Sequence, residues 1–79
     1  MQPETIKRLI EEGMPGARAQ VVGDGQHFEA IIVSEAFEGL SMIKQHQLVY
    51  SALGDRMRAD IHALSMRTLT PAQWATMQK

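Results

Sequence analysis

Two β-prone segments joined by an Asp-Gly pair constrain the fold of this chain more than any other feature. The first segment covers residues 17–22, the second covers residues 27–34, and a Gly-Asp-Gly-Gln sequence at residues 23–26 separates them. Because glycine takes the positive φ of a tight turn without steric cost, an Asp-Gly pair in this position predicts a β-hairpin. We therefore expect the two segments to pair as antiparallel strands.

Helical patterns occupy much of the remaining sequence. Residues 3–13 begin with a proline and end with a glycine, which are typical boundaries of a helix. Residues 42–53 predict a second, amphipathic helix with Ser41 as its N-cap, and a shorter helix is expected from Asp55 to about residue 59. The apolar stripe that we expect to face the core comprises Met42, Val49, Leu53 and Met57.

A third strand is predicted over residues 61–69. More than the roughly dozen residues needed for a crossover separate it from the second strand, and those residues read as helical. If the two strands are neighbours, they should therefore be parallel and joined by a right-handed crossover. Parallel neighbours start at the same edge of a sheet, so we expect His27 and His62, which open these strands, to lie near each other.

The sequence after the third strand predicts a short terminal helix. Thr70 at the N-cap, Pro71 at the first helical position and Gln73 two residues later form a capping box. Trp74 and Met77 are three residues apart, so we expect them to pin this helix to the core. The expected order of elements is α-β-β-α-α-β-α in one α+β domain over residues 1–79.

The absence of cysteine restricts the chemistry of the chain. It excludes disulfides, thiolate zinc sites and any iron–sulfur cluster held by the chain's own sulfur. No apolar run approaches the roughly 20 residues of a membrane span, and the N-terminus lacks the pattern of a signal peptide. A cytoplasmic location is the resulting expectation.

The sequence favours a non-enzymatic protein. It has no Gly-rich phosphate loop and no G-x-S-x-G elbow, and its histidines lack the spacing of a helical zinc site. The acidic pairs Glu11-Glu12 and Glu35/Glu38 are interpreted as solvated surface charges. His27 and His62 have a plain interpretation as structural residues at strand ends. If they bind metal, two imidazoles do not close a site, so the remaining ligands must come from another molecule.

Charge is distributed unevenly along the chain. Residues 1–40 carry three basic and seven acidic side chains, whereas residues 41–79 carry five basic and two acidic ones. A nucleic-acid surface in the second half would use Lys44, Arg56, Arg58 and Arg67. This basic excess is small, so a solvated mixed surface is the plainer interpretation.

Several short motifs resemble the successive signatures of the BolA family. They are Phe-Glu-Gly at residues 37–39, Gln-His-Gln-Leu-Val-Tyr at residues 45–50, Ile-His-Ala-Leu at residues 61–64 and Thr-Leu-Thr-Pro-Ala-Gln-Trp at residues 68–74. Residues 23–28 are similar to the corresponding loop of the short bacterial acid-stress branch. The motifs occur in the family's order and extend over most of the chain.

The resemblance implies a BolA-like fold similar to the type II KH domain, with a three-stranded mixed sheet. It also implies a partner, a monothiol glutaredoxin with glutathione, with which the chain would share a bridging [2Fe–2S] cluster. In that family the histidine of the Ile-His-Ala motif is a cluster ligand, which here is His62. A second ligand comes from the hairpin-loop region, where His27 is the candidate, although it stands at the end of the loop.

The family also suggests an alternative function as a DNA-binding transcriptional regulator. The chain lacks the Gly-x-x-Gly loop that clamps the nucleic-acid backbone in KH domains, and fold analogy alone does not establish the activity. A third possibility is an interaction module that binds its partners without metal. By itself the chain is expected to be a monomer or a weak homodimer.

Overall fold

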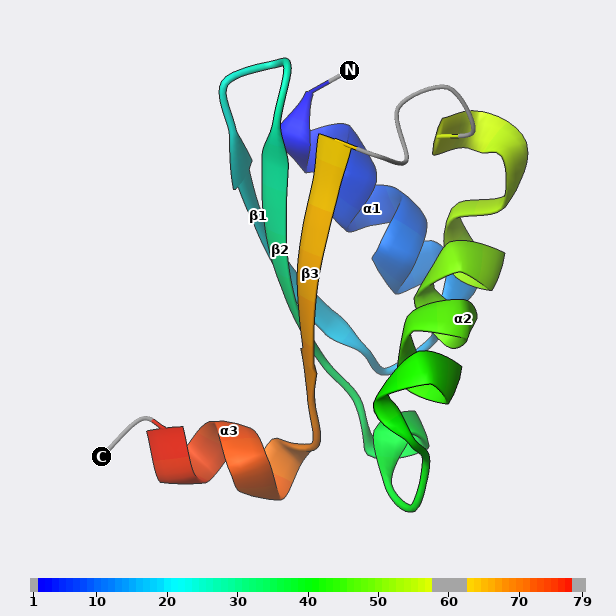
Figure 1. Ribbon diagram of the computed structural model, residues 1–79, viewed down its shortest axis with the longest axis vertical. Helices are drawn as coiled ribbons and strands as arrows, with labels where there is room; N and C mark the ends of the chain where they lie inside the picture. Colours follow the sequence, from blue (N-terminus) through cyan, green and yellow to red (C-terminus); the bar gives the residue numbers. More distant parts are fainter. Residues whose placement is uncertain (1, 58–62, 78–79) are drawn as a thin grey trace.

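The computed structural model describes residues 2–57 and 63–77. The elements along the chain are α1 (Pro3–Gly13), β1 (Arg18–Gly23), β2 (Phe28–Val33), the 3-10 turn η1 (Glu35–Phe37), α2 (Met42–Leu53), the 3-10 turn η2 (Gly54–Met57), β3 (Leu64–Leu69) and α3 (Pro71–Met77). They form two layers, with α1 and α2 packed on one face of a three-stranded sheet (Figure 1). The predicted α+β class is confirmed.

The strand order is β1-β2-β3, so β2 is the central strand. β1 pairs antiparallel with β2, and β2 pairs parallel with β3. Both the predicted hairpin and the predicted parallel crossover are therefore confirmed. Within β2, Phe28, Ala30 and Ile32 are buried against the helices, whereas the alternate residues face the other side of the sheet.

The ends of the strands differ from the predicted ones by a residue or more. β1 extends through Gly23, and β2 begins at Phe28 rather than at His27. The carboxylate of Asp24 accepts hydrogen bonds from the backbone N–H groups of Gln26 and His27, at 2.8 and 2.9 Å, and this holds both residues in the turn. β3 begins at Leu64 rather than at residue 61: Ala63 precedes the strand, and residues 61 and 62 lie outside the described residues.

The core lies between the helices and the sheet. It is built from apolar side chains of α1, β1, β2, α2 and β3, together with Phe37 of η1, which is fully buried. α1 and α2 approach each other closely where Gly13 faces Ala52: a Cβ added at Gly13 would lie 2.7 Å from the Cα of Ala52. Among residues 2–57 and 63–77, no helix combines the length and the apolar character needed to cross a membrane.

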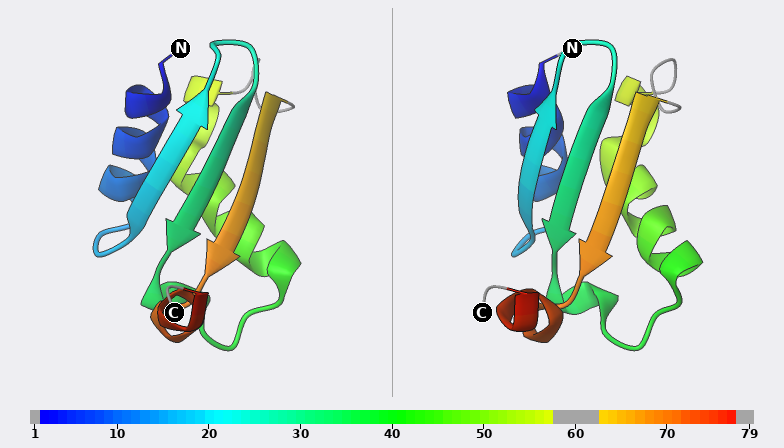
Figure 2. Two further views of the ribbon diagram at one scale, coloured as in Figure 1. Left: turned by 90° about the vertical axis from the view of Figure 1, so that its left-hand side faces the viewer. Right: turned by 60° about the vertical axis from the view of Figure 1, so that its left-hand side comes forward.

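The predicted apolar stripe of α2 is wrong at its first turn. Val49 and Leu53 are buried as expected, but Met42 is 69% exposed. The first turns of α2 reach past β3, so no sheet lies beneath Met42 (Figure 2). The shorter helix expected from Asp55 is observed as the 3-10 turn η2, and its predicted residues beyond 57 lie outside the described part of the chain.

The capping box of α3 is confirmed, but its predicted packing is wrong. The Thr70 N–H donates to Gln73 Oε1 at 2.8 Å, and the Gln73 N–H donates to Thr70 Oγ1 at 3.2 Å. However, α3 has no buried residue, Met77 is 46% exposed and Trp74 is only half-buried. The helix projects from the end of β3 on the side opposite α1 and α2, so it contributes little to the core (Figure 1).

Candidate metal-binding edge of the sheet

The β1–β2 turn positions His27 at one edge of the sheet. Gly25 adopts a positive φ of 94°, and the Asp24 N–H donates to the His27 carbonyl oxygen at 3.2 Å, which closes the turn. The backbone N–H groups of His27 and Gln26 hold the pKa of the Asp24 carboxyl below its ordinary value. The Oδ1 atom of this carboxylate is therefore engaged in fixing the turn.

A shallow hollow of about 340 Å³ lies beside His27 at the turn end of the hairpin. It is lined by Val22, Gly23, Asp24, His27, Phe28, Glu29, Ala63 and Ser65. Phe28 is paired with Leu64 across β2 and β3, so His27 and Ala63, which precede them, lie at the same end of the parallel pair. The His27 side chain is exposed at this edge.

His62 lies outside the described residues, so its predicted proximity to His27 stays a prediction. Ala63, which follows it directly in the sequence, is one of the residues that line the hollow. Within the described residues, no group of three or more His, Asp or Glu side chains could hold a metal ion by itself. A site that uses His27 therefore needs ligands from elsewhere.

The predicted nucleic-acid residues lie on different elements. Lys44 is exposed in the first turn of α2, Arg56 is exposed in η2, and Arg67 is exposed on β3. Lys44 lies roughly 14 Å along the helix axis from the end of α2 at about 1.5 Å per residue, and Arg56 follows in η2 beyond that end. Arg58 lies outside the described residues. The three described cations thus do not gather into one basic patch.

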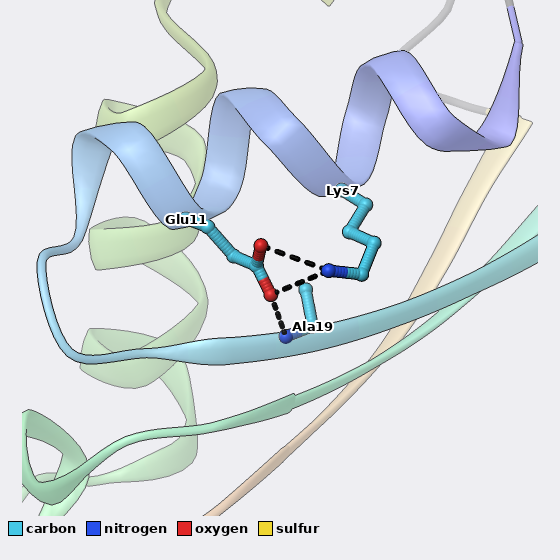
Figure 3. A network of polar contacts seen from close by, with 3 residues as sticks. All are labelled: Lys7, Glu11 and Ala19. Carbon is cyan, nitrogen blue, oxygen red and sulfur yellow. Dashed lines mark hydrogen bonds and ion pairs between the residues drawn. The ribbon is translucent and has the colours of Figure 1, made fainter.

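Glu11, which we interpreted as a solvated surface charge, is instead tied to the sheet. Its Oε2 accepts a hydrogen bond from the Ala19 N–H at 3.0 Å, and its carboxylate pairs with the ammonium of Lys7 at 2.9 Å (Figure 3). The hydrogen bond from Lys7 is the main cause that holds the pKa of the Glu11 carboxyl below its ordinary value, and the hydrogen bond from the Ala19 N–H is the next largest. The four-residue spacing from Lys7 is visible in the sequence, whereas the contact with Ala19 depends on tertiary structure.

Gln45 is a second residue whose role the sequence did not reveal. Its Nε2 donates to the carbonyl oxygens of Phe37 and Leu40, at 3.2 and 2.9 Å. Its Oε1 accepts from the Thr68 hydroxyl at 2.6 Å. One amide thus joins the segment before α2 to β3.

Comparison with known proteins identifies the family. Residues 9–73 match the family described as BolA-like protein. The chain is 36% identical over 80 residues to the acid stress protein IbaG of Escherichia coli strain K12, an alignment that covers 100% of this chain and 95% of that protein. It is also 36% identical to the DNA-binding transcriptional regulator BolA of Vibrio cholerae, over 99% of this chain and 71% of that protein.

A solved structure shows the same fold. The BolA homologue from Coxiella burnetii superposes with a TM-score of 0.86 and 43% sequence identity, covering 95% of this chain and 97% of that one. The sequence match and the structural match extend over the same domain, from α1 to α3. The chain therefore belongs to the BolA family.

Proposed function

We propose that this protein is a non-enzymatic iron–sulfur accessory protein that binds a monothiol glutaredoxin and shares a bridging [2Fe–2S] cluster with it. His62 would be the principal ligand of this chain and His27 the second. The proposal starts from the family membership, and one observation carries it to this site. The Asp24 turn holds an exposed imidazole, that of His27, beside a hollow that Ala63, the residue after His62, also lines.

The ligand chemistry fits a shared site better than a private one. Without cysteine, the chain offers no thiolate ligand to iron, and histidine nitrogens are the candidate ligands at this edge. Histidine ligands replace thiolates at one iron of some [2Fe–2S] clusters and raise the reduction potential. A partner's cysteine and glutathione would supply the thiolates that this chain lacks. When bound, the cluster would supply one-electron redox chemistry and an iron–sulfur unit that can be transferred.

The chain's own residues would present and orient the imidazoles. Asp24 fixes the backbone at His27, because its carboxylate accepts the N–H groups of two successive turn residues. Small side chains at Gly23, Ala63 and Ser65 leave the hollow open, so a partner could approach the His27 ring without displacing bulky groups.

The test is a titration of this protein into cluster-loaded monothiol glutaredoxin with glutathione, followed by visible absorption and circular dichroism. Wild type should change the spectrum with saturation at one chain per cluster, His62→Ala should abolish the change, and His27→Ala should weaken it. His46→Gln is the matched control, because it alters the remaining histidine, which lies on α2. An unchanged spectrum, or an equal change with His62→Ala, rejects the ligand assignment.

The same titration separates cluster sharing from docking without metal. Calorimetry measures whether a His27→Ala/His62→Ala double variant, which lacks both proposed ligands, still binds the glutaredoxin. Retained binding would favour an interaction module that docks without metal. Full binding together with no spectral response in wild type would favour an apo interaction module. A wild type that binds and changes the spectrum, beside a double variant that does neither, supports the shared cluster.

A second candidate, DNA binding, is favoured by the name of the Vibrio cholerae relative. The separation of Lys44, Arg56 and Arg67 over three elements argues for weak electrostatic contact rather than a dedicated groove. Fluorescence anisotropy on duplex DNA across a salt series tests it, because phosphate contacts release counterions and lose affinity steeply with salt. Affinity that is unchanged by Arg56→Glu and Arg67→Glu would reject this function.

A further inference from the structure

The two free edges of the sheet are protected unequally. The Ser34 N–H donates to the Leu69 carbonyl at 3.0 Å, so Leu69 directs its backbone groups toward β2. Successive residues of a strand point their N–H and C=O groups to opposite sides. The outward groups of β3 therefore belong to Leu64, Met66 and Thr68. The Asp24 N–H donates to the His27 carbonyl oxygen, so Asp24 directs its backbone groups toward β2. The outward backbone groups of β1 therefore belong to its odd-numbered residues, which include Ala19.

The edge of β1 is covered. The Ala17 N–H donates to the Met14 carbonyl at 2.9 Å, and the Ala19 N–H donates to Glu11 Oε2 at 3.0 Å (Figure 3). α1 packs against β1 and lies alongside its outer edge (Figure 2). Capping by a charged side chain and covering by a helix are two ways in which proteins prevent unwanted strand pairing.

The edge of β3 carries no comparable protection from the residues that the structure describes. Within residues 2–57 and 63–77, no hydrogen bond reaches the outward backbone groups of Leu64, Met66 and Thr68. An edge strand of six residues with free donors and acceptors is a template for one more strand. The Thr68 side chain, by contrast, bonds to Gln45 on the helix side of the sheet.

The helix layer extends past this edge as if the sheet were one strand wider. The first turns of α2 reach beyond β3 in both views of Figure 2. Met42 and Ile43 are 69% and 71% exposed there, although Met42 follows the same helical stripe as the buried Val49 and Leu53. A strand added to β3 would lie beneath these two side chains and bury them.

The charge beside this edge favours an acidic occupant. Arg67 is exposed on the open face of β3, and Lys44 is exposed in the first turn of α2. Among the described residues, the ion pair within 4 Å joins Lys7 and Glu11. Neither Arg67 nor Lys44 therefore forms an ion pair with another described residue. Glu29 lies on the same face of the neighbouring strand but is opposite Ser65 rather than Arg67.

We propose that β3 accepts an extended acidic segment of a partner protein as a fourth strand. Alternate apolar side chains of that segment would pack against Met42 and Ile43, and its acidic side chains would face Arg67. The backbone groups of Leu64, Met66 and Thr68 would supply the ladder of hydrogen bonds. The inference does not depend on His27 or His62, so it can stand or fall apart from the proposed cluster site.

The probe is a capped peptide of about eight residues that alternates valine and glutamate, titrated into isotopically labelled protein and followed by amide NMR. Saturable shifts should appear at Leu64, Met66 and Thr68, and the exchange of these amides with solvent should slow. Methylating alternate peptide nitrogens removes donors without changing the side chains, and it should weaken binding at least about tenfold. A lysine-for-glutamate version should also bind more weakly.

Two variants test the surface without disturbing the core. Met42→Ser with Ile43→Ser removes exposed side chains that would cover the added strand, and Arg67→Glu reverses the charge; each should weaken binding several-fold. Val22→Ser is the matched control, since Val22 is 62% exposed on the opposite edge strand.

Shifts centred on β1, or equal binding of the methylated peptide, overturn the proposal. If the β3 amides shift as the protein concentration rises without peptide, the edge binds a second copy of this chain. If duplex DNA competes with the peptide at these amides, the edge binds nucleic acid. Either result overturns the proposal of an acidic peptide.

Discussion

The Glu11 carboxylate and the Ala19 backbone are joined across 3.0 Å, from Oε2 to N, and this contact closes the outer edge of β1 with a side chain from α1. Lys7, one helical turn earlier, pairs with the same carboxylate and holds it over the strand. The contact has consequences for both stability and its dependence on pH.

Replacing Glu11 with alanine should lower the free energy of unfolding by about 1–2 kcal/mol. The change removes a charge-assisted hydrogen bond to the main chain, and with it the exposed Lys7 pair, which contributes only about 0.3–0.5 kcal/mol. Urea denaturation measures the difference. Glu12→Ala is the control, because Glu12 is an exposed neighbour on the same helix and its loss should change stability by less than about 0.5 kcal/mol. Equal effects of the two substitutions would contradict the role given to Glu11.

The same carboxylate should make stability fall in acid. The Lys7 and Ala19 hydrogen bonds lower the pKa of Glu11 in the folded state below its ordinary value of 4.5. A depressed pKa means that its stabilisation is fully present above 4.5 and is lost as the pH falls through the folded value. Wild type and Glu11→Gln should therefore differ most near neutral pH and converge in acid. A stability difference that stays constant as the pH falls would contradict this assignment.

The features that the sequence predicted well are those whose partners lie close together along the chain. The Thr70–Gln73 capping box, the Ser41 N-cap and the Asp24 turn each involve residues within four positions. Such contacts form in any context that allows the local backbone conformation, so the sequence pattern is sufficient. The parallel pairing of β2 and β3 was also predictable, because a long helical crossover permits little else.

The features that were missed depend on where the sheet ends. Met42 has the periodicity of a core residue, but its burial requires a strand beneath the first turn of α2, and the sheet stops at β3. Trp74 and Met77 have helical spacing, yet α3 leaves the sheet before it can cover the core. For the candidate site, the sequence predicted the edge at which His27 lies, and the pairing with His62 stays a prediction.

Replacing Gly13 with alanine should destabilise the protein by about 1–3 kcal/mol, because the added Cβ would overlap α2. It would lie 2.7 Å from both Cα and Cβ of Ala52 and 2.8 Å from its carbonyl oxygen. Thermal unfolding measures the cost. Adding Ala52→Gly should not restore stability, since two of the three obstructing atoms belong to the backbone. Full recovery in the double variant would show that only the Ala52 methyl stands in the way.

Replacing Gln45 with leucine should cost about 2–3 kcal/mol, because it leaves the Leu40 carbonyl and the Thr68 hydroxyl without their partner, whereas the Phe37 carbonyl still accepts from the Leu40 N–H. Thr68→Val removes one end of this network and should cost about 1 kcal/mol. If the 2.6 Å bond couples α2 to β3, the double variant should be more stable than the sum of the single losses predicts, by about 0.5–1 kcal/mol.

A double-mutant cycle in urea measures this coupling, with Gln47→Leu as the matched control. Gln47 is exposed on the same helix, so its substitution should change stability by less than about 0.5 kcal/mol and should add independently to Thr68→Val. Additive losses for Gln45 and Thr68 would mean that the amide supports the segment before α2 alone. A coupling above about 0.5 kcal/mol would show that Gln45 also holds the first turn of α2, with its exposed Met42 and Ile43, beside the edge of β3.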